Sequence, residues 1–134
     1  MPLIGDLQRF KADYLKAMGH PVRVRVLEIL RQGEAAVAEM QPQLGAEVAN
    51  LSQHLAVLRG AGIVSTRKVG LRVLYRVRDV EVFVILDALR QIFSQRLDSM
   101  QTLLAADDAR RSGSVRSRRR PQRPEGDAAV TGPS

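Results

Sequence analysis

The spacing of apolar residues changes twice along this chain, and the change limits the folds open to it. Apolar residues recur every three or four positions up to about Arg59, alternate from Ile63 to Val77, and return to the helical period after Asp79. A period near 3.6 is typical of amphipathic helices, and a period of two is typical of half-buried strands. The sequence therefore predicts a mainly α fold with one short antiparallel sheet.

Turn and cap residues set the limits of the predicted helices. Proline suits a first helical position and discourages extension inside a helix, and glycine often closes one. The first helix is expected to end before Gly19, and the second to run from His20-Pro21 to Gly33. The third is expected to span Ala35–Gln41, and the fourth to run from about Ala46 to Arg59.

Two strands and a last helix complete the expected order. The strands are Ile63–Arg67 and Arg72–Val77, joined as a hairpin with Gly70 at its tip. Asp79 is expected to cap a long helix that reaches about Ala105. The order α-α-α-α-β-β-α, with two short helices before a hairpin, predicts a winged helix-turn-helix.

Composition divides the chain near Ala106. Residues 107–134 lose nearly all apolar side chains and gain Arg, Ser, Pro and Gly, so we expect a disordered, Arg-rich C-terminal tail. Residues 1–106 are expected to form the DNA-binding and dimerisation domain. The net charge of +7 divides into +3 in the tail and +4 in the domain, so the basic character is not confined to the tail. Such a balance favours a polyanionic partner, nucleic acid first.

The fourth helix carries the predicted base-reading residues. At 100° per residue, its outward face opposes the apolar stripe formed by Val48, Leu51, Leu55 and Leu58. Asn and Gln can pair bidentately with adenine in the major groove, and Ser or His can bond to several base edges. His54 taken alone is more typical of a hydrogen-bonded packing residue. The candidate DNA contacts on this helix are Ala49, Asn50, Ser52, Gln53, His54 and Arg59.

The hairpin supplies the predicted phosphate contacts. Five cations lie on about twelve residues with no acid among them, namely Arg67, Lys68, Arg72, Arg76 and Arg78. Charge can also protect an edge strand from aggregation, but that role does not require five charges of one sign. We therefore expect Arg67, Lys68 and Arg72 to contact the DNA backbone.

Apolar residues at both ends of the domain predict a homodimer. The last helix has a seam close to a heptad pattern, and it also carries apolar residues outside that seam. The first helix has a similar excess. The predicted dimer interface contains Leu7, Phe10, Tyr14, Phe93, Leu97, Met100 and Leu104. A two-fold dimer would place two reading helices about one DNA turn apart on a near-palindromic operator.

Several stretches resemble the ArsR/SmtB family of bacterial repressors. The resemblance is carried by residues 16–30, residues 50–64 and the hairpin between Arg67 and Tyr75, and covers roughly residues 8–105. It implies a homodimeric winged-helix regulator that binds operator DNA through the helix containing Ser52-Gln53-His54 and through the wing. Many members of that family release DNA when a metal or another effector binds.

The chain departs from the metal-sensing members of that family. Ala36 and Ala38 stand where thiolate-sensing members carry two cysteines, and no His follows His54. The chain has no Cys and two His, too few borderline-metal ligands for a well-formed site in one subunit. We therefore expect no conventional metal-sensing site and predict no cofactor. A small-molecule effector, a co-regulatory protein and a role for the tail all stay open.

The remaining function classes are less well supported. No nucleophile–base pair, phosphate-cradling Gly-rich loop or metal cluster appears, so we do not expect an enzyme. No apolar run is long enough to span a bilayer and no signal peptide is evident, so a cytoplasmic location is expected. A winged-helix protein-interaction module with only non-specific DNA affinity is the alternative to a sequence-reading regulator.

Overall fold

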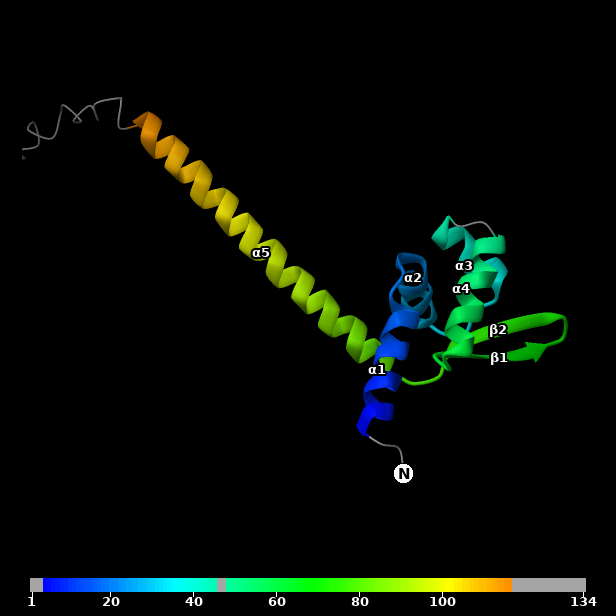
Figure 1. The fold of residues 1–134 in the computed structure, drawn as a ribbon. Helices are drawn as coiled ribbons and strands as arrows, with labels where there is room; N and C mark the ends of the chain where they lie inside the picture. Colours follow the sequence, from blue (N-terminus) through cyan, green and yellow to red (C-terminus); the bar gives the residue numbers. More distant parts are fainter. Residues whose placement is uncertain (1–3, 46–47, 117–134) are drawn as a thin grey trace, which may run out of the picture. The chain divides into compact units, whose positions relative to one another are not determined.

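The computed structural model describes residues 4–45 and 48–116 of the chain (Figure 1). The elements are α1 (Ile4–Met18), α2 (Pro21–Leu30), α3 (Val37–Leu44), α4 (Val48–Gly60), β1 (Val64–Val69), β2 (Arg72–Val77) and α5 (Glu81–Arg116). This is the order predicted from the sequence. The chain divides into two units, Met1–Leu89 and Arg90–Ser134, each of which is described by itself.

The core of the first unit is built from aliphatic side chains and methionine. It draws one or more buried residues from α1, α2, α3, α4, the start of the hairpin and the start of α5. Among the described residues no polar or charged side chain is buried. The most deeply buried are Val26, Leu27, Met40, Leu51, Leu55, Leu58, Ile63, Val64 and Val82. Burial of the α4 stripe at Leu51, Leu55 and Leu58 turns the opposite face of that helix to solvent.

Helix α2 is fixed at both of its ends. His20 has an extended backbone at the N-cap, and its Nδ1 accepts a hydrogen bond from the Val22 backbone N–H at 3.1 Å. At the other end, Arg31 donates two hydrogen bonds, of 2.6 and 2.8 Å, to the carboxylate of Asp87. The Arg31 guanidinium also lies over the Phe83 ring, 5.3 Å from its centre. The predicted limits of this helix are confirmed to within a few residues.

Helix α3 lies further along the chain than the prediction over Ala35–Gln41. Its start is delayed because Ala35 forms two backbone hydrogen bonds with Tyr75 of β2, of 3.1 and 2.9 Å. Its end lies beyond Pro42, so the expected stop there was wrong. Proline removes only its own N–H from the ladder, and the residue deprived of that donor, Ala38, is exposed. Gly45, with φ of 62°, closes the helix.

The hairpin β1–β2 is antiparallel and closes on Gly70 and Leu71. Gly70 has a φ of 63°, which explains glycine at the predicted tip. The register pairs Arg67 with Leu74 and Val69 with Arg72. Because opposed residues share a face, Arg67, Arg72 and Arg76 lie on one face of the hairpin. The other face carries the half-buried Tyr75 and Val77.

Helix α5 differs from its prediction at both ends. It begins at Glu81, and Asp79 contributes its backbone carbonyl, which accepts from the Val82 N–H at 3.1 Å. It continues past Ala105 to Arg116, so residues 107–116, which we expected in a disordered tail, are helical. An ion pair of 3.2 Å between Asp107 and Arg111, one turn apart, supports this extension. Residues 117–134 lie outside the described ranges, and the boundary at Ala106 stays a prediction.

No helix within the described ranges is both long enough and apolar enough to span a membrane.

Candidate nucleic-acid interface

The outward face of α4 carries polar side chains and no acid. Asn50, Ser52, Gln53 and Arg59 are exposed, as is Val57. Between Asn50 and Arg59 the sequence contains neither Asp nor Glu, so nothing on this stretch would repel a phosphate backbone. Ala49 is within α4, but its side chain lies outside what the structure describes. The arrangement fits a helix that presents amide and hydroxyl groups to the edges of base pairs.

His54 differs from its neighbours on α4 because it has contacts inside the protein. Its ring centre lies 4.2 Å from that of His20, and its Nδ1 lies 3.2 Å from Nη1 of Arg23. The pKa of His54 is lowered from its ordinary value of 6.5, first by burial and then by the nearby His20 and Arg23. These contacts fit the packing role that the sequence favoured for a lone histidine.

Two of the predicted wing cations form ion pairs within the protein. Arg67 donates from Nε to Oε2 of Glu34 at 2.6 Å, and Arg72 pairs with Glu39. Arg67 lowers the pKa of the Glu34 carboxyl through this hydrogen bond. Lys68 is exposed and forms no ion pair with any residue in the described ranges. Of the three predicted phosphate contacts on the wing, Arg67 and Arg72 are therefore paired with acids near α3, and Lys68 faces solvent.

Glu34 and Glu39 were not singled out by sequence reasoning. Each lies 33 positions from its arginine, so no local spacing could reveal the pairs. The two Ala35–Tyr75 hydrogen bonds bring this part of the chain beside β2. An informative signal would have been the contrast between the all-basic hairpin and the two acids that flank the start of α3.

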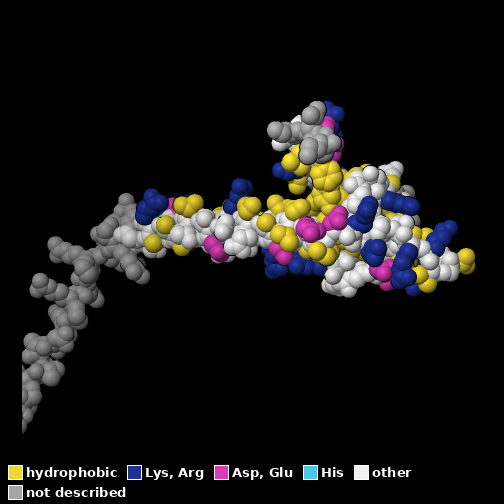
Figure 2. All heavy atoms as spheres, turned by 90° about the horizontal axis from the view of Figure 1, so that it is seen from below, with side chains coloured by type: hydrophobic (Ala, Val, Ile, Leu, Met, Phe, Trp, Pro, Cys, Tyr) yellow, Lys and Arg dark blue, Asp and Glu magenta, His cyan; other side chains and the backbone are white. Residues whose placement is uncertain are grey.

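Basic side chains gather over the hairpin end of the first unit, as Figure 2 shows from below. Hydrophobic side chains appear at the hairpin tip, where Leu71 is fully exposed. The same view shows acidic side chains beside the basic ones, in line with the pairs formed by Glu34 and Glu39.

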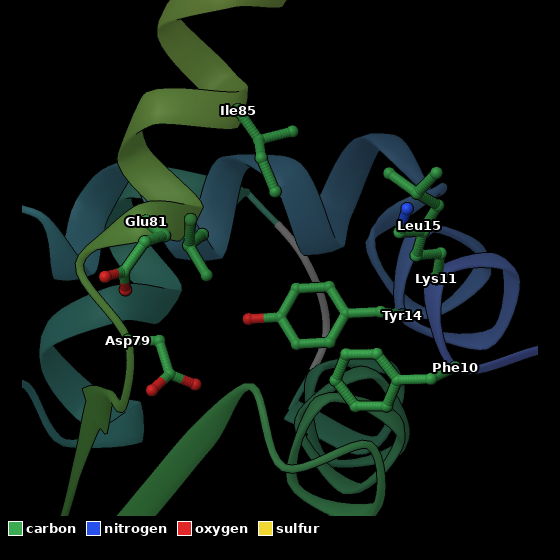
Figure 3. Close-up of a pocket in the computed structure, with 8 residues that line it drawn as sticks. Phe10, Lys11, Tyr14, Leu15, Asp79, Glu81 and Ile85 are labelled. Atoms are coloured by element: carbon green, nitrogen blue, oxygen red, sulfur yellow. The ribbon is translucent and has the colours of Figure 1, made fainter. Parts of the chain in front are cut away.

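A separate apolar surface is found where α1 meets the start of α5. The rings of Phe10 and Tyr14 contact each other at a tilt of 41°, with centres 5.7 Å apart, and Phe10 is 61% exposed. They line an open cavity of about 390 Å³ with Lys11, Leu15, Asp79, Glu81, Val82 and Ile85 (Figure 3). The Tyr14 hydroxyl points to the side that carries Asp79 and Glu81. Burial, and then those two carboxylates, raise the pKa of Tyr14.

The second unit has exposed apolar side chains along α5. Phe93, Leu97, Met100 and Leu104 are exposed, and Phe93 reaches 63%. Figure 2 shows hydrophobic side chains along this helix between charged ones. The predicted dimer residues thus divide into a group on α1, with Leu7 and Phe10 exposed and Tyr14 half-buried, and a group on α5.

The described residues hold no group of three or more His, Cys, Asp or Glu side chains that could bind a metal ion. Ala36 is buried at the N-cap of α3, and Ala38 is exposed in its first turn. Of the acids on α5, Asp87 is bound to Arg31 and Asp107 to Arg111.

Comparison with known proteins identifies the family. The profile of bacterial regulatory proteins of the arsR family matches residues 20–66, from the α2 N-cap into β1. The HTH-type transcriptional regulator Rv0081 of Mycobacterium tuberculosis is 34% identical over 110 residues, which cover 81% of this chain and 95% of that protein. The chain belongs to the ArsR family of bacterial regulatory proteins.

Solved structures of similar proteins confirm the winged helix-turn-helix fold. The crystal structure of Rv0081 matches the structure of this chain with a TM-score of 0.63. The match covers 69% of this chain and 94% of Rv0081. The homodimeric winged helix-turn-helix DNA-binding domain of Mb0332 from Mycobacterium bovis has a TM-score of 0.62 at 27% sequence identity. The match covers 68% of this chain and 84% of the Mb0332 domain. The transcriptional repressor BigR of Xylella fastidiosa has a TM-score of 0.59 at 35% sequence identity. The match covers 69% of this chain and 97% of BigR. This chain is therefore a transcriptional regulator of the ArsR family.

Proposed function

We propose that this ArsR-family protein represses transcription by binding a near-palindromic operator as a homodimer. The observation that carries the proposal is the exposed, acid-free face of α4, which lies next in the chain to a hairpin rich in arginine. Asn50, Ser52 and Gln53 would contact base edges in the major groove. Lys68, with Arg67 and Arg72, would contact phosphates from the wing.

The apolar surfaces on α1 and α5 support the homodimer. Side chains as exposed as Phe10 and Phe93 are costly to leave in water, and a second copy would cover them. The cavity between Phe10, Leu15 and Ile85 would be closed by the same partner. A homodimer also fits the reported state of the Mb0332 domain. Two copies then present two α4 helices to one operator.

We propose further that metal binding does not control this protein. The chain has no Cys, its two His lie against each other, and His54 also contacts Arg23. Addition of Zn²⁺ or Ni²⁺ at micromolar concentration should leave operator affinity unchanged. A metal-dependent loss of affinity that chelation restores would contradict this part of the proposal.

Fluorescence anisotropy tests the proposed DNA binding. The full chain is titrated onto DNA from upstream of its own gene and onto a scrambled duplex of equal length, each at two salt concentrations. A preference of about 10³-fold or more for the native duplex is expected for a specific binder. Equal binding to both duplexes would contradict sequence reading at that site. No binding to either would instead favour a protein-interaction module.

A further inference from the structure

The two histidines of the chain form one cluster between α2 and the predicted recognition helix. His20 occupies the N-cap of α2 and His54 the middle of α4, with ring centres 4.2 Å apart and ring planes inclined by 38°. Arg23, in the first turn of α2, completes the cluster by its contact with His54. No other histidine exists in the 134 residues.

The hydrogen bonds of the cluster specify where its protons lie. Nδ1 of His20 accepts from the Val22 N–H, so it carries a lone pair. A guanidinium can only donate, so Nδ1 of His54, 3.2 Å from Nη1 of Arg23, must also be unprotonated. In this arrangement we therefore assign both Nδ1 atoms as acceptors and the ring proton of each histidine to Nε2.

Burial, and then the neighbouring His20 and Arg23, oppose a proton on His54. From α2 it faces His20 and Arg23. From α1, Asp13 and Lys16 line a hollow that also includes Arg23, whose Nε donates to the Ala17 carbonyl at 2.6 Å. A proton on Nδ1 of His54 would remove the acceptor for Arg23 and place two cations in contact. A proton on Nδ1 of His20 would remove the cap of α2.

His54 lies directly beside the predicted base-reading residues. Gln53 precedes it, and Asn50 lies one turn before it on α4. A rotation or shift of α4 at His54 would move both side chains, and base recognition tolerates little displacement of bidentate groups. The cluster thus joins the N-terminus of α2 to the position of the reading face.

We propose that His20 and Arg23 are positioning residues that hold α4 in its DNA-binding position through neutral His54, so that acidification weakens operator binding. The inference rests on the proposed function, because it assumes that α4 reads the operator. The direction in which operator affinity changes with pH distinguishes this role from that of a histidine that contacts DNA directly. A histidine that touched a phosphate would bind DNA more tightly when protonated.

The first experiment follows the two imidazoles by ¹⁵N NMR of the full chain in the absence of DNA. Two pairs of ring-nitrogen signals are expected, one pair from each histidine, and both pairs should show the Nε2–H tautomer at neutral pH. His54 should titrate below 6.5, in line with its lowered pKa. Replacement of His20 by Asn keeps a good N-cap and removes one ring, so the pKa of the remaining histidine should rise. An ordinary pKa for His54 in the wild type, or no change on H20N, would overturn the proposal.

The second experiment measures operator affinity between pH 7.5 and 5.5 at constant ionic strength. If binding releases one proton, the affinity should fall about tenfold for each pH unit below the pKa of His54. His54→Gln keeps an acceptor for Arg23 without a titrating group, so its operator affinity, measured relative to its own value at pH 7.5, should vary less with pH than that of wild type. Tighter wild-type binding at low pH, or an unchanged pH profile in H54Q, would overturn the proposal.

Thermal unfolding keeps the inference testable if no DNA is bound. Because the pKa of folded His54 lies below 6.5, the unfolded chain takes up its proton first as the pH falls. The free energy of unfolding should therefore fall from about pH 6.5 down to the lowered pKa, and this part of the loss should be absent in H54Q. Its presence without DNA binding would contradict only the proposed function. Equal pH dependence in the two proteins would overturn the cluster itself.

Discussion

The guanidinium of Arg67 in the wing is hydrogen-bonded to the carboxylate of Glu34, just before α3, at 2.6 Å. Arg72 and Glu39 repeat this relationship nearer the hairpin tip. Both arginines are among the predicted phosphate contacts. A phosphate oxygen and a carboxylate oxygen compete for the same N–H donors, so DNA binding by these arginines requires that they exchange one partner for the other.

Removal of the competing carboxylates should therefore tighten DNA binding. We expect the double variant Glu34→Gln and Glu39→Gln to bind operator and scrambled duplexes a few-fold more tightly than wild type, with a steeper salt dependence. Glu28→Gln is the matched control, because Glu28 pairs with Arg25 on α2 and not with the wing. Anisotropy at two salt concentrations measures the effect. A gain for each carboxylate removed that is no larger in the double variant than in E28Q would attribute the change to net charge alone.

Substitutions on α4 and on the wing should affect binding in different ways. Gln53→Ala should reduce discrimination between operator and scrambled duplexes by about 1–3 kcal/mol, because it removes a group predicted to contact bases. Lys68→Ala should weaken binding to both duplexes alike and reduce the salt slope by about one. The two variants serve as controls for each other in the same titration. Identical profiles would argue against separate reading and phosphate-binding surfaces.

A charge on the exposed seam of α5 should dissociate the proposed dimer. Phe93→Asp places a carboxylate where an apolar ring is expected to be buried by the second copy, and an unpaired buried charge is strongly unfavourable. Light scattering coupled to size exclusion should report a dimer mass for wild type and a monomer mass for F93D. Gln91→Asp, also exposed on α5, should stay dimeric. A dimer mass for F93D would place the interface elsewhere.

Truncation of the buried stripe of α4 should destabilise the whole first unit. Leu51 is fully buried, so Leu51→Ala should lower the free energy of unfolding by about 2–5 kcal/mol. The neighbouring Ser52 is exposed, and Ser52→Ala should change stability by about 0.5 kcal/mol or less. Urea unfolding followed by circular dichroism measures both. A loss of similar size in the two variants would contradict the assigned faces of α4.

The order of elements could be predicted because each depends on local signals. The helical stripe of α4, the glycine at the hairpin tip and the alternation in β2 are all encoded within a few residues. The exposure of Asn50, Ser52 and Gln53 followed directly from the position of the stripe. The boundaries were harder to predict where a distant partner decides them. Ala35 has a helical neighbourhood in sequence, but it is extended because Tyr75 bonds to it.

The partners of the candidate site residues could not be predicted for the same reason. Residues that the sequence presents as five like charges meet acids 33 positions away in two cases. His54 meets a residue 31 positions away in Arg23, and also the ring of His20. The sequence contained all of these residues, but only the packing of α2, α3 and α4 around one core brings them together.

The pairing register of the hairpin has a consequence for how such wings can diversify. Arg67, Arg72 and Arg76 share a face only because strand side chains alternate with a period of two. A single residue inserted within β2 would carry the residues on one side of it to the opposite face, whereas two inserted residues would restore the alternation. At the hairpin tip, where Leu71 is fully exposed, an insertion of one residue would leave the alternation of both strands unchanged. Wings of this kind can therefore change freely in length at the turn, but only in even steps within their strands.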